Sequence, residues 1–131
     1  MIIEPRFGDV DGLGHINNTV LPQWFEKARN PLFRIFHPDL DLDLKKWRLI
    51  LAKIEIDFRR PILYQNNVEI RTYVERIGTS SFTLLHQAWQ NDQLASKSKA
   101  VGVYYDFINE RSLPIPDDIK QKLLEHTPSK S

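Results

Sequence analysis

The 131-residue sequence contains no cysteine, which excludes disulfide bonds, a catalytic thiolate and zinc sites built on cysteine. It has no excess of one charge either, because 18 Lys and Arg side chains face 17 Asp and Glu side chains. A chain with balanced charges lacks the excess of basic side chains that attracts nucleic acids and anionic membranes. No apolar run approaches the roughly 20 residues of a membrane-spanning helix, and no charged-then-apolar leader opens the chain. We therefore expect a cytoplasmic protein with no nucleic-acid partner and no membrane association.

Hydrophobic residues form 41% of the chain and charged residues 27%, a balance that fits one folded domain over residues 1–131. In the segment 19–36, apolar side chains recur every three or four residues, which predicts a helix with one buried face. Pro31 lies inside this segment and cannot donate a backbone hydrogen bond, so we expect a kink or break near Asn30. A second, shorter helix is predicted to begin at Pro116.

Most of the remaining chain alternates between apolar and polar residues, which predicts strands. A short first strand is expected within residues 1–7, and four longer ones follow the helix: Trp47 to Phe58, Val68 to Ile77, Phe82 to Ala88, and Leu94 to Phe107. A hairpin turn is predicted at Asn91-Asp92-Gln93, and the tail after His126 is expected to be loosely held. This order predicts an α+β protein in which an antiparallel sheet shares one long helix as its cover. Because a single covering helix leaves apolar area and strand edges exposed, we expect a homodimer.

The stretch from Asp9 to Asn18 holds two carboxylates, two glycines, a histidine and two asparagines directly before the long helix. The first N–H groups of a helix have no partner within it, and the helix dipole adds positive charge there, so they can stabilise an oxyanion. Asn17 or Asn18 is suited to cap the helix. We expect Asp9 to order the loop, and Asp11 could do the same without any catalytic role. The pattern nevertheless predicts a site for chemistry that passes through an anionic transition state.

Other motifs with related letters are excluded by their spacing. A calcium-binding EF-hand loop starting at Asp9 would need ligands at Leu13 and Val20, which have none to offer. The remaining histidines, His37, His86 and His126, are scattered without the spacing of metal ligands, so no metal site is predicted. No serine lies in a G-x-S-x-G nucleophile elbow either, which disfavours an α/β-hydrolase mechanism.

The string R-F-x-D-x-D-x-x-G-H-x-N-N over residues 6–18, continued by Trp24 to Arg29, resembles the signature of hotdog-fold acyl-CoA thioesterases of the 4-hydroxybenzoyl-CoA thioesterase type. Ile56 to Pro61 and Gly78 to Phe82 are similar to later strands of that family, so the resemblance covers essentially the whole chain. It implies the hotdog fold, an antiparallel sheet wrapped around one long helix, here with a short C-terminal helix. It also implies a homodimer with the active site between subunits, or a tetramer made of two dimers.

The resemblance implies hydrolysis of an acyl-CoA thioester to a free carboxylic acid and CoA, with coenzyme A as part of the substrate and no other cofactor. Asp11 matches the family's catalytic carboxylate, which acts as a nucleophile or as a general base on water. The backbone N–H of Asn18 corresponds to the donor that holds the thioester carbonyl. His15 could hydrogen-bond the carboxylate, the thioester or the leaving group, or could simply tie the loop to the sheet.

A second set of residues is expected to bind the substrate, and it consists of Asn17, Gly14, Gly78, Ser80, Ser81, Arg59 and Arg60. The glycine and serines at 78–81 stand where the resemblance places a strand bulge near the pantetheine arm, although a simple interruption between strands also fits. The arginines at 59 and 60 could meet the CoA phosphates, as could Lys97 and Lys99. Two alternative functions stay open: a hydratase or dehydratase acting on acyl thioesters, and a non-catalytic acyl-CoA-binding module.

Overall fold

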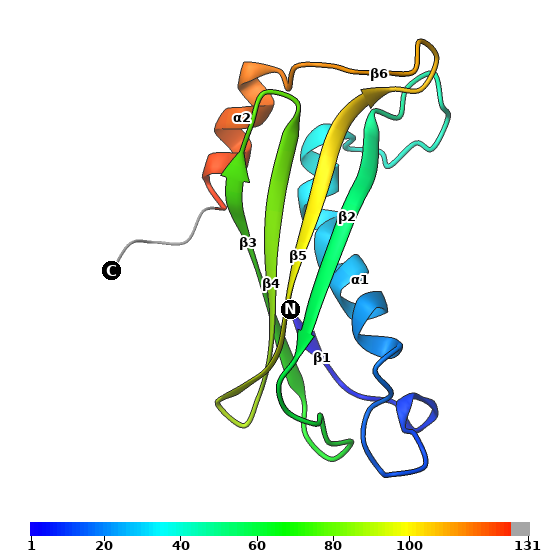
Figure 1. Cartoon of the computed structure of the whole chain (residues 1–131), viewed down its shortest axis with the longest axis vertical. Helices are drawn as coiled ribbons and strands as arrows, with labels where there is room; N and C mark the ends of the chain where they lie inside the picture. The colour runs from blue at the N-terminus through cyan, green and yellow to red at the C-terminus, as the bar shows by residue number, and fades with distance from the viewer. Residues whose placement is uncertain (127–131) are drawn as a thin grey trace.

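A computed structural model describes residues 1–126, which form an antiparallel six-stranded sheet with helices packed against it (Figure 1). The elements, in chain order, are β1 (Ile2–Ile3), the 3-10 helix η1 (Phe7–Asp9), α1 (Val20–Phe36), β2 (Leu49–Phe58), β3 (Val68–Ile77), β4 (Ser81–Gln90), β5 (Gln93–Asp106), β6 (Arg111–Ser112) and α2 (Asp117–Leu124). The strands lie in the order β1-β3-β4-β5-β2, and β6 pairs with the end of β5. Our expectation for the tail after His126 concerns residues outside this description.

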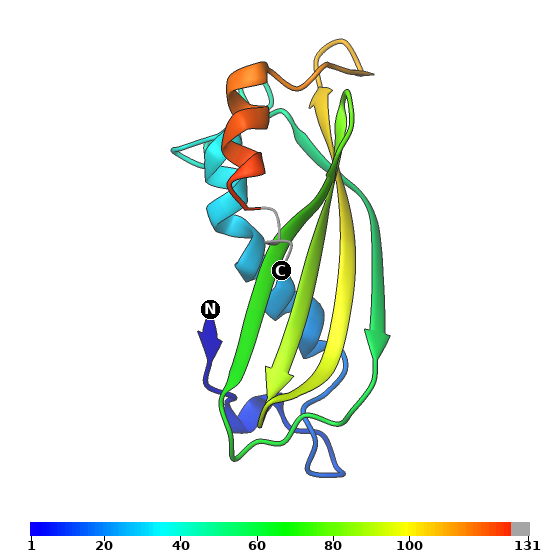
Figure 2. The same cartoon turned by 90° about the vertical axis from the view of Figure 1, so that its left-hand side faces the viewer.

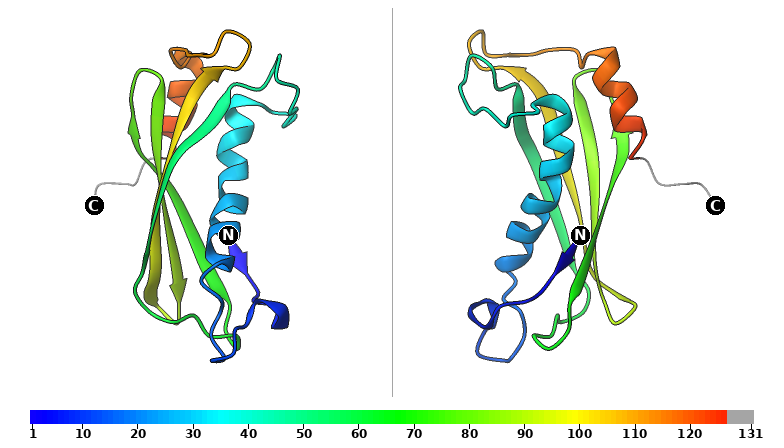
Figure 3. Two further views of the ribbon diagram at one scale, coloured as in Figure 1. Left: turned by 45° about the vertical axis from the view of Figure 1, so that its right-hand side comes forward. Right: turned by 180° about the vertical axis from the view of Figure 1, so that it is seen from behind.

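The sheet curves around α1, and α2 packs beside α1 and β3 (Figures 2 and 3). This is the arrangement expected of the hotdog fold. The predicted hairpin turn between β4 and β5 is confirmed, with Asn91 and Asp92 at φ +52° and +60°, as a tight two-residue turn requires. Within residues 1–126, no helix is long and apolar enough to cross a membrane.

We expected a kink or break near Asn30, and the break is wrong, because α1 runs without interruption through Pro31. Proline removes one hydrogen bond, but most of a helix's stability in a protein comes from packing of its apolar face. That face is buried on both sides of the proline, at Ala28 and Leu32. Pro31 itself is exposed, where water can hydrogen-bond the carbonyl that loses its partner.

The first strand is shorter than the predicted span of residues 1–7. β1 covers only Ile2 and Ile3, which pair with β3 next to Met1, hydrogen-bonded to Ile70, and Phe7 belongs to η1 with 82% of its surface exposed. Pro5 explains the difference, because its nitrogen has no hydrogen to donate to a strand ladder. The chain therefore leaves the sheet after two pairs and turns toward the loop that precedes α1.

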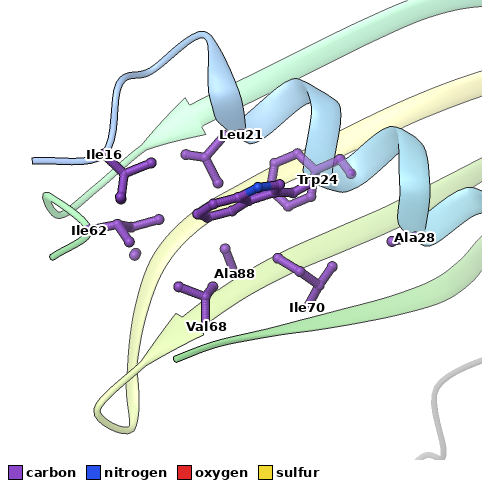
Figure 4. Packing of buried hydrophobic residues seen from close by; sticks show 10 residues of the cluster. Ile16, Leu21, Trp24, Ala28, Ile62, Val68, Ile70 and Ala88 are labelled. Atoms are coloured by element: carbon purple, nitrogen blue, oxygen red, sulfur yellow. The ribbon is translucent and has the colours of Figure 1, made fainter. Parts of the chain in front are cut away.

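Two apolar clusters fill the space between α1 and the sheet. In the first, the indole of Trp24 lies between Leu21 on the helix and the sheet residues Val68, Ile70 and Ala88 (Figure 4). The second surrounds the opposite end of α1, where the rings of Phe36 and Phe82 stack with centroids 5.0 Å apart. The first cluster lies next to the loop before α1 and anchors it, because Ile16 of that loop is one of its members.

Gly102 in β5 should tolerate no side chain, because Phe82 occupies the space above it. A Cβ atom at position 102 would lie under 3.0 Å from three ring carbons of Phe82. We expect Gly102→Ala to lower the free energy of unfolding by about 1–3 kcal/mol, the usual effect of overpacking, as measured by chemical denaturation. Gly8→Ala is the matched control, because a Cβ there meets nothing within 4 Å. A double variant with Phe82→Leu should recover part of the loss, and a loss equal in both backgrounds would contradict this explanation.

Candidate active site

The loop before α1 is held in place by backbone hydrogen bonds within itself and to the segment after β2. Inside the loop, the N–H of Asp11 donates to the carbonyl of His15 at 2.8 Å, and the N–H of Asn17 donates to the carbonyl of Asp9 at 2.8 Å. The N–H of Ile16 donates to the carbonyl of Ile62 at 2.8 Å, which joins the loop to the segment after β2. Gly14 has φ +78°, a conformation that other residues rarely adopt, so this turn requires a glycine.

The two carboxylates of the loop have different environments. Asp9 is buried, and its oxygens accept hydrogen bonds from the backbone N–H of Arg6 at 2.9 Å and from the Arg6 guanidinium at 3.3 Å. Asp9 therefore orders the start of the loop, as predicted. Asp11 is only half-buried, and its Oδ1 accepts from the N–H groups of Leu13 at 2.9 Å and His15 at 3.3 Å. Its other oxygen, Oδ2, accepts no hydrogen bond from the described residues and is free to act on a ligand.

The capping residue of α1 is Thr19, so the expectation that Asn17 or Asn18 caps the helix is wrong. Asn17 instead forms a turn just before the helix. Its Oδ1 accepts hydrogen bonds from the N–H of Thr19 at 3.0 Å and from the Thr19 hydroxyl at 2.9 Å. This turn delays the start of the helix and exposes Asn18. The backbone N–H of Asn18 donates to no group in the part of the chain described here.

A pocket of about 450 Å³ brings together residues of the loop before α1 and residues at and after the end of β2. Asp11, His15 and Asn18 line it together with Arg59 and Arg60, and its remaining lining is apolar: Ile16, Leu21, Phe58, Pro61 and Ile62. The two arginines are exposed, and their backbone N–H groups both donate to the carbonyl of Ala95, at 2.8 and 3.0 Å. The pocket thus combines a partly free carboxylate, an unpaired N–H near a helix start, an imidazole and two guanidinium groups.

His15 contributes to the loop through its backbone and to the pocket through its side chain. Its backbone pairs with Leu63 in an isolated antiparallel bridge, which ties the loop to the segment after β2. The residue is half-buried and lines the pocket, and its imidazole has no hydrogen-bond partner among residues 1–126. His15 therefore lines the same pocket as Asp11.

The residues at 78–81 lie at the opposite end of the sheet from this pocket (Figure 1). They connect β3 to β4 by a turn in which the N–H of Gly78 donates to the carbonyl of Ser81 at 2.7 Å, and the carbonyl of Ser80 accepts from Tyr104 at 2.7 Å. The irregularity in the pairing of β3 lies between Val74 and Arg76, before this turn. Within one chain, Gly78, Ser80 and Ser81 are therefore not brought to the pocket of Asp11.

Lys97 and Lys99 also lie away from the pocket. They alternate along β5 with Ser96, Ser98 and Ala100, which are buried under α1, so the lysines project from the other face of the sheet. Lys99 forms an ion pair with Glu75 there, at 3.1 Å. No group of three or more His, Asp or Glu side chains able to hold a metal ion occurs within residues 1–126.

A row of polar residues, buried except for the half-buried Thr72, lies between the two apolar clusters and was not predicted from the sequence. Thr72, His86 and Ser98 lie directly opposite one another on β3, β4 and β5, and Arg29 of α1 is buried above the sheet. The hydroxyl of Thr72 and Nδ1 of His86 share a hydrogen bond of 2.9 Å. The signal was present, because Arg29 stands four residues after Phe25 and so falls on the apolar side of the helix.

Burial is the main cause of the pKa shifts of the two ionisable residues in this row, His86 and Arg29. It lowers the pKa of His86 to about 3, and the positive charge of Arg29 acts in the same direction. Burial also lowers the pKa of Arg29, while the negative charge of Glu26 raises it. His86 is therefore neutral at pH 7, and the guanidinium of Arg29 is the charged member of the row.

Comparison with known proteins identifies the family to which this arrangement corresponds. Residues 5–123 match the model of the thioesterase-like superfamily. A predicted thioesterase from Bacillus stearothermophilus is 40% identical, with a TM-score of 0.92 over 100% of this chain and 97% of that one. A thioesterase from Thermus thermophilus, solved with coenzyme A and Zn, is 31% identical, with a TM-score of 0.80 over 94% of each chain.

A hypothetical protein from Staphylococcus aureus, solved in complex with CoA, has the same fold at 10% identity, with a TM-score of 0.86 over 100% of this chain and 86% of that one. These likenesses confirm the hotdog fold. No protein of curated function matches the sequence.

The buried His86 should make the protein sensitive to acid. Its pKa is about 3 in the folded protein against an ordinary value of 6.5, so the unfolded chain binds a proton in this window that the folded chain does not. Stability should therefore fall as the pH drops from about 6.5 to about 3, by on the order of 5 kcal/mol at most. Denaturation at several pH values should show a shallower slope for His86→Gln than for the wild type. An unchanged slope would contradict this assignment, and His126→Gln, at an exposed position, is the control.

Proposed function

Because the chain belongs to the thioesterase-like superfamily, we propose that it hydrolyses an acyl-CoA thioester to a free carboxylic acid and CoA. One observation carries the proposal: Asp11 and Asn18 line the same pocket, and Oδ2 of Asp11 and the backbone N–H of Asn18 have no partner in the described protein. A carboxylate and an oxyanion donor on the same carbonyl group are the minimum that thioester hydrolysis requires.

In the proposed reaction, the thioester carbonyl oxygen accepts a hydrogen bond from the N–H of Asn18, where the helix dipole favours negative charge. Oδ2 of Asp11 then either attacks the carbonyl carbon or removes a proton from a water molecule that does so. On the first route, the C–S bond breaks to give an acyl-aspartyl anhydride and CoA thiolate, and water later hydrolyses the anhydride. On the second, water gives the acid directly. The imidazole of His15 lies in the same pocket and can meet the leaving sulfur.

The substrate's coenzyme A is assigned to the arginine side of the pocket. Arg59 and Arg60 are exposed at the pocket's edge with no ion pair to another described residue, so they can meet the phosphates of CoA. The CoA-bound thioesterase from Thermus thermophilus supports this ligand. Within the superfamily, the D-x-D-x-x-G-H-x-N-N motif favours the 4-hydroxybenzoyl-CoA thioesterase type.

We also propose that the enzyme is a homodimer joined through β2, or a tetramer of such dimers. β2 forms one edge of the sheet over ten residues, and Ile50, Leu51, Ile54 and Phe58 on it are each at least 39% exposed. A long edge strand with exposed apolar side chains is usually covered by another chain. Antiparallel pairing of two β2 strands about a two-fold axis brings opposite ends of the two sheets together. The turn at 78–81 of the partner subunit then lies at the end that holds Asp11.

Asp11→Asn should abolish most of the activity and leave the fold intact. The amide keeps an oxygen that can accept hydrogen bonds from the same two backbone N–H groups, but it cannot act as a nucleophile or a base. We expect kcat for thiol release from acyl-CoA to fall by roughly 10²- to 10⁴-fold, with little change in the melting temperature. The control Asp39→Asn, at an exposed position outside the pocket, should retain full activity.

The substrate panel should run from short aliphatic to aromatic acyl-CoA and include an enoyl-CoA. Turnover of Asp11→Asn near the wild-type rate would contradict the assigned role. Hydration of the enoyl thioester without thiol release would instead identify a hydratase, and tight CoA binding without release from any acyl group would identify a binding module.

Ile54→Lys should separate the subunits, because it places a charge on the edge of β2 where the partner is proposed to lie. Light scattering after size exclusion should give at least twice the chain mass for the wild type and the single chain mass for the variant. Ile108→Lys, an equally drastic change in the exposed turn after β5, should remain oligomeric. A monomeric wild type would contradict the proposed interface.

A further inference from the structure

A second hollow, of about 380 Å³, is lined by residues of α1 and β2, the two elements that also contribute to the pocket of Asp11. Along the helix, Leu21 lines the first pocket and its neighbour Pro22 lines the second. Along the strand, Phe58 lines the first and Ile54 the second. Most of the second hollow is apolar, so it suits a hydrocarbon chain that extends from a thioester held at the helix start.

One charged group on the wall of this hollow has no counter-ion. Arg29 is only 3% exposed, and its Nε and Nη1 find no partner in the described protein. Beneath the helix, Nε2 of His86 and Oγ of Ser98 are also buried without partners. If Thr72 donates its hydroxyl hydrogen to Nδ1 of the neutral His86, then Nε2 carries the ring hydrogen. The unpartnered groups are then all able to donate hydrogen bonds, and none of the described side chains accepts from them.

Such a donor set is costly unless a ligand supplies the acceptor. An unpaired buried donor costs about 1–3 kcal/mol, and more when the group is charged. A guanidinium presents its N–H groups in a planar fork that matches the two oxygens of a carboxylate. The guanidinium of Arg29 therefore fits an anion with more than one oxygen, and the apolar hollow that Arg29 lines fits the chain that carries this anion.

We propose that the hollow holds the acyl group of the substrate and that Arg29, which lines it, recognises a carboxylate at the far end of that group. The inference rests on the proposed thioesterase function and narrows its substrate to thioesters of dicarboxylic acids. Asn18 and Arg29 are eleven residues apart, about 16 Å along a helix, and the Arg29 side chain leans back toward the helix start. The carboxylate must therefore sit on an extended chain rather than on a short one.

Glu26 lines the same hollow, and its negative charge opposes the binding of a carboxylate by Arg29. It is exposed, and no ion pair joins it to Arg29, although its charge raises the pKa of the guanidinium. Water screens the charge of an exposed carboxylate, whereas the buried Nε and Nη1 of Arg29 are shielded from water. Glu26 therefore weakens carboxylate binding without replacing it, and Glu26→Gln should increase the preference for a carboxylated chain.

The test compares octanoyl-CoA with the CoA thioester of octanedioic acid, which differs only by the terminal carboxylate. We expect wild-type kcat/KM to be about 10- to 100-fold higher for the carboxylated substrate, the effect of a buried hydrogen-bonded charge. Arg29→Met should bring the ratio of the two values close to one. Lys27→Met removes a positive charge from the exposed side of the same helix and should leave the ratio unchanged.

Glu26→Gln provides a second variant in case Arg29→Met does not fold. Glu26 is exposed, so this change should hardly affect the melting temperature, while the substrate ratio should rise about threefold or more because a like charge is removed from the wall of the hollow. Hydrolysis of both substrates at equal rates would overturn this inference and leave the proposed function standing. Failure to hydrolyse either substrate, or any other acyl-CoA, would overturn both. Wild-type stabilisation by chloride, combined with a ratio near one, would show a simple ion site and also overturn the inference.

Discussion

The hydrogen bond from the N–H of Ile16 to the carbonyl of Ile62 is the contact on which the arrangement of the site depends. It joins two segments 46 positions apart in the chain, the loop before α1 and the segment after β2. Burial of both isoleucines in the Trp24 cluster removes competing water from this bond. This connection holds the loop of Asp11 next to the segment of Arg59 and Arg60, so that the three residues line one pocket.

The core is divided because the sheet carries polar side chains at its middle. Thr72 separates Ile70 from Val74 on β3, and His86 separates Leu84 from Ala88 on β4. A continuous apolar core would be more stable, since a buried cation loses its hydration. The protein offsets this cost through the two apolar clusters on either side. The row is thus a place where stability is given up, and such places are frequently functional.

The open edge of β2 and the location of the turn at 78–81 both bear on whether one chain holds a complete site. In one chain, the groups expected to meet the substrate lie at two ends of an elongated sheet (Figure 1). The ten-residue edge of β2 is unpaired on its outer side and carries exposed apolar side chains. A second copy joined there would cover the edge and turn the two half-sites toward each other, so assembly and activity would be coupled.

The sequence by itself was sufficient for the local features, since each depends on near neighbours along the chain. The amphipathic repeat located α1, alternation located the long strands, and the asparagine and aspartate at 91–92 located a hairpin turn. The polar loop of the candidate site was also recognisable from its motif alone. Tertiary structure decided the remaining features. Packing of Ala28 and Leu32 carries the helix across Pro31, the side chain of Asn17 moves the cap to Thr19, and packing of α1 on the sheet buries Arg29. These outcomes depend on how particular side chains pack and bond in three dimensions, and a periodic pattern in sequence contains no information about such contacts.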